Sequence, residues 1–178
     1  MPNFVFIGAS IDGYIADRNN KLDFLECIPN PENVDFGFQD FMQSVDCVIM
    51  GRNTFETILG VGGEWHYSKP VFVLSSSLTS VPDKLKDNVE IMQGEINDII
   101  TALNKRGFSR LYIDGANVIQ SFLKKDIIDE VIISTVPMLL GGGTKLFGML
   151  PAHLSFEHME TQVLLNALVQ TRYKRKKE

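Results

Sequence analysis

Short apolar runs alternate along this chain with segments of helical periodicity, and this alternation limits its fold more than any other feature. Seven runs rich in β-branched and aromatic residues are predicted to be strands, at residues 4–9, 47–50, 71–74, 89–92, 111–113, 131–136 and 168–173. Several of these runs are apolar without interruption, which is typical of strands covered on both faces. The alternation therefore predicts an α/β domain with a largely parallel sheet and helices on both of its faces.

The segments between these runs carry apolar residues at helical spacing. The first has them at i, i+3, i+4 and i+7, namely at Phe38, Phe41, Met42 and Val45. Residues 96–103 repeat this spacing before a glycine stops the helix, and shorter helices are expected at residues 54–59 and 118–125. After residue 131 the helical pattern ends. Two or three strands with a glycine-rich turn are therefore expected to finish the sheet as an antiparallel edge or hairpin.

Length and charge exclude several classes of protein. A chain of 178 residues, 44% of them hydrophobic, suits a single domain, which we take as residues 1–178. The net charge is −5 although basic residues crowd the end of the chain, so the remaining surface is strongly acidic and argues against a nucleic-acid partner. No apolar run reaches the roughly 20 residues that a membrane helix needs. We therefore expect a soluble, cytoplasmic protein with no membrane partner.

The two cysteines, Cys27 and Cys47, are flanked by apolar residues and are expected to be buried free thiols in a reducing compartment. Neither the cysteines nor the three histidines have the spacing of a zinc site. The sequence therefore predicts no bound metal.

The segment after the second predicted strand has the composition of an anion site. Gly51 ends that strand and a helix follows at once, so unpaired backbone N–H groups and the positive end of a helix dipole are expected there. The guanidinium of Arg52 and the hydroxyl of Thr54, with Asn53 between them, would complete a site for a phosphate monoester. In the alternative interpretation, Arg52 pairs with a surface acid and Thr54 only caps the helix.

A second junction follows the third predicted strand. Leu74 is followed there by three serines, Ser75, Ser76 and Ser77, whose hydroxyl and N–H groups would line a polar rim for a ligand. Serines after a strand also form ordinary turns, so this junction has two interpretations.

A third junction joins a predicted strand to a helix through Gly115, Ala116, Asn117 and Val118. Small residues let the backbone approach a pyrophosphate closely. A tight turn with Asn117 as the N-cap would use the same residues. Three junctions of this kind in one α/β sheet favour a nucleotide cofactor.

The three junctions resemble those of a known family. Residues 50–56, Met-Gly-Arg-Asn-Thr-Phe-Glu, are similar to the M-G-R-x-T-aromatic-E segment of dihydrofolate reductases, and residues 73–76 and 112–123 are similar to two later segments of that family. Residues 10–16 and the glycine-rich run at 137–147 resemble the bacterial subfamily of RibD C-terminal domains, the riboflavin-pathway reductases. The resemblance implies a dihydrofolate reductase-like three-layer α/β/α fold. Its mixed, mostly parallel sheet would have about eight strands and an antiparallel C-terminal hairpin.

The resemblance also implies hydride transfer from NADPH to a small heterocycle, of either the dihydrofolate (pteridine) type or the 5-amino-6-(5-phosphoribosylamino)uracil type. It assigns residues 51–54 to the adenosine 2′-phosphate, residues 74–76 to the adenine ribose and residues 115–118 to the pyrophosphate. Ile15 and Ala16 would lie near the nicotinamide. A homodimer with the late strands at its interface is implied as well.

The proton that accompanies a hydride needs a donor, and two acids are candidates. In dihydrofolate reductases the pterin-binding acid starts the helix before the Met-Gly-Arg strand, and counting back from Gly51 places Asp35 there. Asp35 would alternatively favour the helix N-terminus electrostatically. Asp12 is the second candidate, or it holds the turn at residues 10–16 through backbone hydrogen bonds. Asp114 replaces a glycine of the family and is expected to point away from the pyrophosphate or to bond the backbone.

Two loops remain open to interpretation. The glycines at 141–143 lack the residue order of a phosphate loop; the resemblance puts them near the substrate and the dimer contact, and otherwise they permit a bulge. Trp65, His66 and Tyr67 either line the substrate mouth or pack as an ordinary loop. The leading hypothesis is an NADPH-dependent reductase of a small molecule. The alternative is a non-catalytic nucleotide-binding or interaction domain on the same scaffold.

Overall fold

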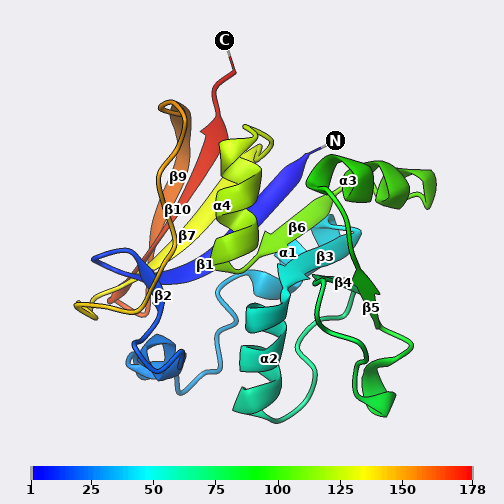
Figure 1. The fold of residues 1–178 in the computed structure, drawn as a ribbon. Helices are drawn as coiled ribbons and strands as arrows, with labels where there is room; N and C mark the ends of the chain where they lie inside the picture. Colours follow the sequence, from blue (N-terminus) through cyan, green and yellow to red (C-terminus); the bar gives the residue numbers. More distant parts are fainter. Residues whose placement is uncertain (1, 178) are drawn as a thin grey trace.

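The computed structural model describes residues 2–177 and contains a large mixed sheet with helices packed on it (Figure 1). Its strands are β1 (Asn3–Ser10), β2 (Tyr14–Ala16), β3 (Cys47–Gly51), β4 (Val71–Leu74), β5 (Val89–Met92), β6 (Leu111–Asp114), β7 (Glu130–Val136), β8 (Thr144–Lys145), β9 (Phe156–Leu164) and β10 (Leu168–Arg175). Its α-helices are α1 (Phe38–Ser44), α2 (Arg52–Val61), α3 (Ile96–Lys105) and α4 (Ala116–Lys124), and the short 3-10 helices are η1 (Asp23–Glu26) and η2 (Asp83–Leu85).

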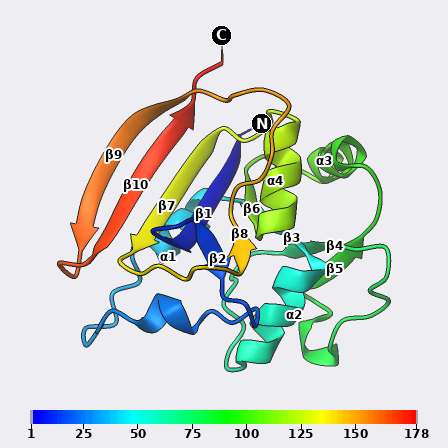
Figure 2. The same cartoon turned by 60° about the vertical axis from the view of Figure 1, so that its left-hand side comes forward.

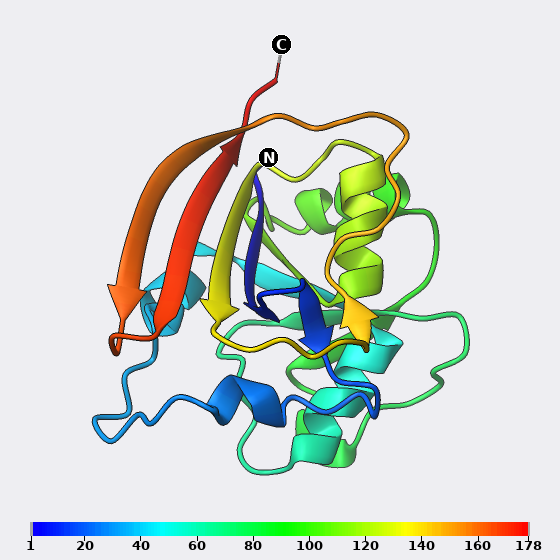
Figure 3. The same ribbon diagram turned by 90° about the vertical axis from the view of Figure 1, so that its left-hand side faces the viewer.

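Eight of the strands form one sheet in the order β5-β4-β3-β6-β1-β7-β10-β9. The strands from β5 to β7 are parallel, whereas β10 runs antiparallel to β7 and β9 runs antiparallel to β10. Figure 3 shows the β9–β10 hairpin at one edge of this sheet. The predicted fold class, a dihydrofolate reductase-like α/β sheet with an antiparallel C-terminal hairpin, is confirmed.

The two faces of the sheet carry separate hydrophobic clusters, because successive side chains of a strand point to opposite faces. Cys47 and Ile49 of β3 pack with α3 and α4, whereas Val48 and Met50 pack with α1 and α2. Phe122 of α4 is fully buried, and so are these four residues of β3. The sheet is therefore the middle layer of three, as its uninterrupted apolar strands predict.

Two parts of the C-terminal region differ from the expectation. The hairpin turn between β9 and β10 is formed by Leu165 and Asn166, both with positive φ, rather than by glycines. The glycines at 141–143 lie instead between β7 and β8, and β8 pairs with β2 in a separate two-stranded sheet (Figure 2). Strand β9 has no apolar run because nearly all of its side chains are exposed, so its sequence carries no periodic signal.

The prediction of two buried thiols is half wrong. Cys47 is buried in β3, and desolvation raises the pKa of its thiol to about 12. Cys27 follows η1 and is exposed, whereas the nearby apolar residues Phe24 and Ile28 are buried.

Candidate active site

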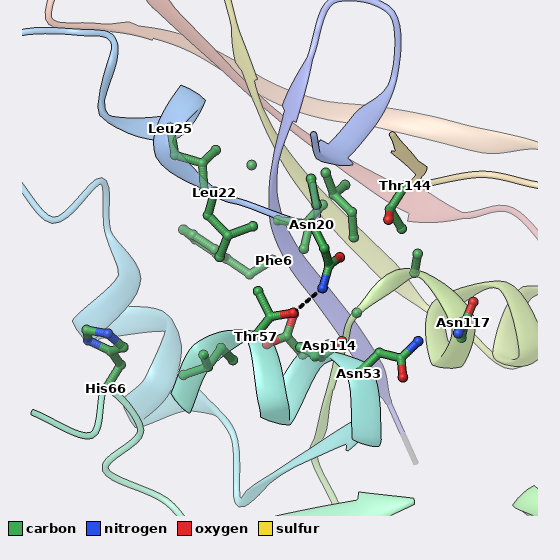
Figure 4. Close-up of a pocket in the computed structure, with 18 of the residues that line it drawn as sticks. Phe6, Asn20, Leu22, Leu25, Asn53, Thr57, His66, Asp114, Asn117 and Thr144 are labelled. Atoms are coloured by element: carbon green, nitrogen blue, oxygen red, sulfur yellow. Dashed lines mark hydrogen bonds between the residues drawn. The ribbon is translucent and has the colours of Figure 1, made fainter. Parts of the chain in front are cut away.

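A cavity of about 380 Å³ opens between the carboxyl ends of the parallel strands and helix α2 (Figure 4). Strand β1 contributes Phe6, and the segment around η1 contributes Leu22 and Leu25. Asn20 donates a hydrogen bond of 2.5 Å to the hydroxyl of Thr57 on α2, which ties the mouth of the cavity together. The cavity is therefore a mainly apolar chamber at the end of the sheet where α/β proteins bind ligands.

A second cavity, of about 320 Å³, adjoins the first and runs along the N-terminal ends of α2 and α4. Asn53, Thr54 and Asn117 line both cavities. Because three residues are shared, one elongated ligand can occupy the second cavity and reach into the first. We call the second cavity the groove and the first the chamber.

Helices α2 and α4 both begin at the groove without a side-chain cap. Gly51 is the N-cap of α2 and Gly115 is the N-cap of α4, and no side chain of residues 2–177 caps either helix. The first N–H groups of each helix are free to bind an anion, and both helix dipoles favour negative charge there. This arrangement fits the phosphates of a dinucleotide.

The close approach of the two helices depends on Gly115. Its φ is +83°, a left-handed conformation that favours glycine, and a Cβ at this position would lie 1.9 Å from the Oγ1 of Thr54. The Thr54 hydroxyl therefore occupies the space that a side chain would take. A glycine at this turn keeps the backbone open to the ligand.

Arg52 supplies the positive charge of the groove. Its Nη1 donates a hydrogen bond of 2.9 Å to the Oγ of Ser77, and its Nε lies 3.8 Å from a carboxylate oxygen of Glu56. Both contacts are exposed, so they hold the guanidinium loosely and leave it able to bind a phosphate. Ser77 is the third of the serines after β4 that were predicted to line a polar rim.

Ile15 and Ala16 line the chamber from β2. Their position depends on the glycines at 141–143, which we call the glycine loop. Strand β2 pairs with β8 just after this loop, and a Cβ on Gly143 would lie 2.1 Å from the carbonyl oxygen of Ala16. The backbone of the loop thus packs directly on β2. Thr144, the next residue, also lines the chamber.

Most residues predicted to bind a cofactor border the chamber or the groove. Those that line at least one of the two cavities are Ile15, Ala16, Gly51, Arg52, Asn53, Thr54, Leu74, Gly115, Ala116, Asn117 and Val118. Ser75 and Ser76 lie just beyond the groove and line neither cavity. The hydroxyl of Ser75 accepts hydrogen bonds from the backbone N–H groups of Ser77 and Leu78, so it stabilises the turn after β4.

Asp114 is the acid at the wall of the chamber, and it is 6% exposed. The hydroxyl of Tyr67 donates a hydrogen bond of 2.5 Å to its Oδ2, and the hydroxyl of Tyr112 flanks it while donating to the carbonyl oxygen of Phe6. Burial raises the pKa of Asp114, and the hydrogen bonds from the Tyr67 hydroxyl and the Gly115 N–H, together with the adjacent Tyr112 hydroxyl, oppose that shift. Asp114 is thus a buried carboxyl that takes up a proton more readily than a free one.

The two acids predicted as proton donors occupy other places. Asp35 is exposed and accepts hydrogen bonds from the N–H groups of Gly37 and Gln39, at 3.1 and 2.9 Å, and it lines neither the chamber nor the groove. It therefore holds the start of α1, which is the alternative role considered for it. Asp114 was expected to point away from the pyrophosphate or to bond the backbone. It does accept a hydrogen bond from the Gly115 N–H, but it also borders the chamber, where Tyr67, 47 residues away in the chain, binds it.

Asp12 connects two loops beside the chamber without lining it. Its carboxylate accepts a hydrogen bond of 2.6 Å from Ser10 and further bonds from the N–H groups of Leu140 and Gly141. These hydrogen bonds, that from Ser10 first, hold the pKa of Asp12 below its usual value. A carboxyl that stays ionised is a poor proton donor, whereas it suits the role of joining the turn after β1 to the glycine loop.

The loop before β4 contributes two chamber residues. His66 and Tyr67 line the chamber, and Figure 4 shows His66 at its outer side. Trp65 instead packs its ring against Phe55 and Tyr67, with centroid distances of 5.9 and 5.3 Å.

Within the described residues, no helix is long and apolar enough to cross a membrane, and no group of three or more His, Cys, Asp or Glu side chains is arranged to hold a metal ion.

The chain is similar to proteins of one family over nearly its whole length. The model of the RibD C-terminal domain family matches residues 4–169. The uncharacterized protein YwjB of Bacillus subtilis (strain 168) is 34% identical over 146 residues, and the match covers 80% of each chain. A crystal structure of a protein from Shewanella sp. PV-4, provisionally named a riboflavin biosynthesis protein, superposes with a TM-score of 0.96 and 52% identity, covering 99% of this chain and all of that one.

The fold is also that of dihydrofolate reductase. The enzyme from Enterococcus faecalis, solved in complex with NADP(H) and RAB-propyl, superposes with a TM-score of 0.65 over 99% of this chain and 97% of that one. Its sequence identity is 16%, so this similarity concerns the fold alone.

Proposed function

The chain belongs to the RibD C-terminal domain family, and from this premise we propose that it is an NADPH-dependent reductase of a small heterocycle. The observation that carries the proposal is the continuity of the groove and the chamber. Two uncapped helix N-termini and Arg52 border the groove, and a buried acid, Asp114, borders the chamber that the groove enters. The groove, which would bind phosphates, and the chamber, which holds an acid, would thus act as one site.

The residues present fit the dinucleotide. The N–H groups at the starts of α2 and α4 would bind its phosphates, and Arg52 would bind the 2′-phosphate that distinguishes NADPH from NADH. Ile15 and Ala16 would contact the nicotinamide ring, and Ser75 and Ser76 would border the adenine ribose. When bound, NADPH supplies the hydride that the protein lacks.

The protein's own residues would bind the heterocycle and manage its proton. The apolar walls of the chamber exclude water from the ring, and the amide and hydroxyl groups of Asn20, Thr57 and Thr144 lie at its mouth. Asp114 would hold an N–H edge of the heterocycle and release a proton to the ring nitrogen next to the reduced carbon. Because burial raises its pKa, Asp114 keeps that proton at higher pH than a free carboxyl does.

The test is direct titration with NADPH followed by measurement of its oxidation in the presence of reduced and oxidised pterins and aminopyrimidines. Binding of NADPH together with turnover of at least one heterocycle is the expected result. Tight binding without any turnover would favour the alternative, a non-catalytic nucleotide-binding domain on this scaffold. Failure to bind at millimolar NADPH would contradict both.

A homodimer through the late strands is part of the proposal. Val163 of β9 and Val169 of β10 are cross-strand partners and are 63% and 38% exposed, and the neighbouring pair on that face is Thr161 and Thr171. An uncharged exposed sheet face of this kind suits a second copy of the chain. In sedimentation, Val163→Lys should convert the dimer to a 20.0 kDa species, whereas Val61→Lys, at the exposed end of α2, should not.

A further inference from the structure

We propose that the substrate of the chamber carries no phosphate or carboxylate group, and that it is a neutral or cationic heterocycle. This inference rests on the proposed function, because it names the substrate class of the same site. It excludes the anionic forms of both substrate types that the family resemblance leaves open. A phosphoribosyl group and a glutamate tail are both anionic, and both would have to be accommodated at the chamber.

The chamber offers no cation to an anionic substrate. Among its lining residues, all of which lie in the described chain, none is lysine or arginine, and the one carboxyl group is that of Asp114. The lining residues include one histidine, His66, and no stronger base. Transferring an anion from water into such a site without a partner charge is costly, and a carboxyl group such as that of Asp114 supplies no positive charge to offset this cost.

The surface at the mouth of the chamber is acidic. A neighbouring hollow shares Asn20 and Thr57 with the chamber. It is lined by three carboxylates, those of Asp23, Glu26 and Glu56, and by one cation, that of Lys21. An anionic tail that extended out of the chamber in this direction would therefore meet net negative charge.

The other cations near the site do not line the chamber. Arg52 faces the groove and contacts Ser77. The Nη2 of Arg18 donates a hydrogen bond of 2.7 Å to the carbonyl oxygen of Gly141, and the Nζ of Lys145 lies 5.9 Å from the centroid of the Tyr14 ring. The site thus separates its charges, with the phosphates of the cofactor at the positive groove and an uncharged ring in the chamber.

The experiment compares matched pairs of ligands that differ by one phosphate. The pairs are 6-hydroxymethyl-7,8-dihydropterin and its monophosphate, and 5-amino-6-ribitylaminouracil and its 5′-phosphate, titrated calorimetrically into the protein with and without saturating NADPH. We expect the neutral member of at least one pair to bind about tenfold or more tightly than its ester. An ester that binds as tightly as its neutral partner, or the absence of binding by all four compounds, would overturn the inference.

A substitution that adds a cation tests the same idea from the protein side. His66→Arg places a guanidinium at the outer side of the chamber and should raise the affinity for the phosphate ester by about tenfold relative to the neutral compound. The matched control His153→Arg, at an exposed loop position outside the chamber, should leave the ratio of these two affinities unchanged. An unchanged ratio in both variants would contradict the inference. NADPH binding, measured in the same preparations, reports separately on the proposed function.

Discussion

The hydroxyl of Tyr67 donates a hydrogen bond of 2.5 Å to the Oδ2 of Asp114, although 47 residues separate them in the chain. Tyr67 comes from the loop after α2, and Asp114 ends β6. Both side chains are buried at the wall of the chamber, so the pair sets the protonation of the acid that faces the ligand.

Removing the proton of Asp114 should abolish most of the activity. In Asp114→Asn the amide still accepts the Tyr67 hydrogen bond but cannot release a proton, so we expect kcat to fall by about 10²-fold or more. Asp35→Asn makes the same chemical change at an exposed helix start and should alter kcat by less than about twofold, since Asn and Asp are similar helix caps. A large loss in Asp35→Asn with none in Asp114→Asn would reverse the assignment.

Tyr67→Phe should move the pH profile of the reaction. The Tyr67 hydrogen bond lowers the pKa of Asp114, so its loss raises that pKa further. If protonated Asp114 is the donor, the rate falls as pH rises through its pKa, and the variant should keep its activity to higher pH than the wild-type protein. The measurement is kcat/KM against pH for both proteins. A fall at lower pH in the variant would contradict the assigned role.

The same pKa shift should appear in stability. The folded protein retains the Asp114 proton at pH values where the unfolded chain, with an ordinary carboxyl pKa near about 4, has released it. The stability contributed by this group is therefore complete below pH ~4 and is lost as pH rises through the folded pKa. Asp114→Asn lacks this loss, so its Tm relative to wild type should be higher at pH 8 than at pH 4. An equal difference at both pH values would argue that Asp114 titrates normally.

A side chain at Gly115 should close the junction between α2 and α4. Gly115→Ala combines a left-handed φ with a clash against Thr54, so we expect a loss of roughly 1–3 kcal/mol of stability and at least tenfold weaker NADPH binding. Gly60→Ala, in α2, meets no atom within 4 Å and has no positive φ. It should be neutral or slightly stabilising. Thermal unfolding measures the stability of the two variants, and titration measures their affinity for NADPH. Equal stability and equal affinity in Gly115→Ala and Gly60→Ala would contradict the close packing of Gly115 on Thr54.

The parallel part of the sheet was predictable because burial on both faces leaves continuous apolar runs. The β4 and β5 strands match the predicted residues, and α2 and α4 begin two residues earlier than predicted because the glycines before them already end the strands. Strand β9 escaped prediction since it is exposed, and the β2–β8 pair is too short to show periodicity.

The candidate site was predictable where it depends on local sequence. The junctions at Gly51 and Gly115 are strand-to-helix turns whose chemistry lies within a few residues. The acid of the chamber was not predictable in this way, because burial and a tyrosine from a distant loop give Asp114 its character. Asp12 and Asp35 have conspicuous positions in the sequence, but the carboxylates of both accept hydrogen bonds from backbone N–H groups.

The central claim, that the groove binds NADPH through Arg52 and two helix N-termini, is tested most directly by comparing the affinities of NADPH and NADH. Arg52→Gln removes the charge that would bind the 2′-phosphate, and Arg106→Gln, whose arginine pairs with Glu90 away from the groove, is the control. We predict that Arg52→Gln weakens NADPH binding about tenfold or more and NADH binding by less than about twofold, with no change in the control. Unchanged NADPH affinity in Arg52→Gln, or no binding of either dinucleotide to the wild-type protein, would contradict the claim.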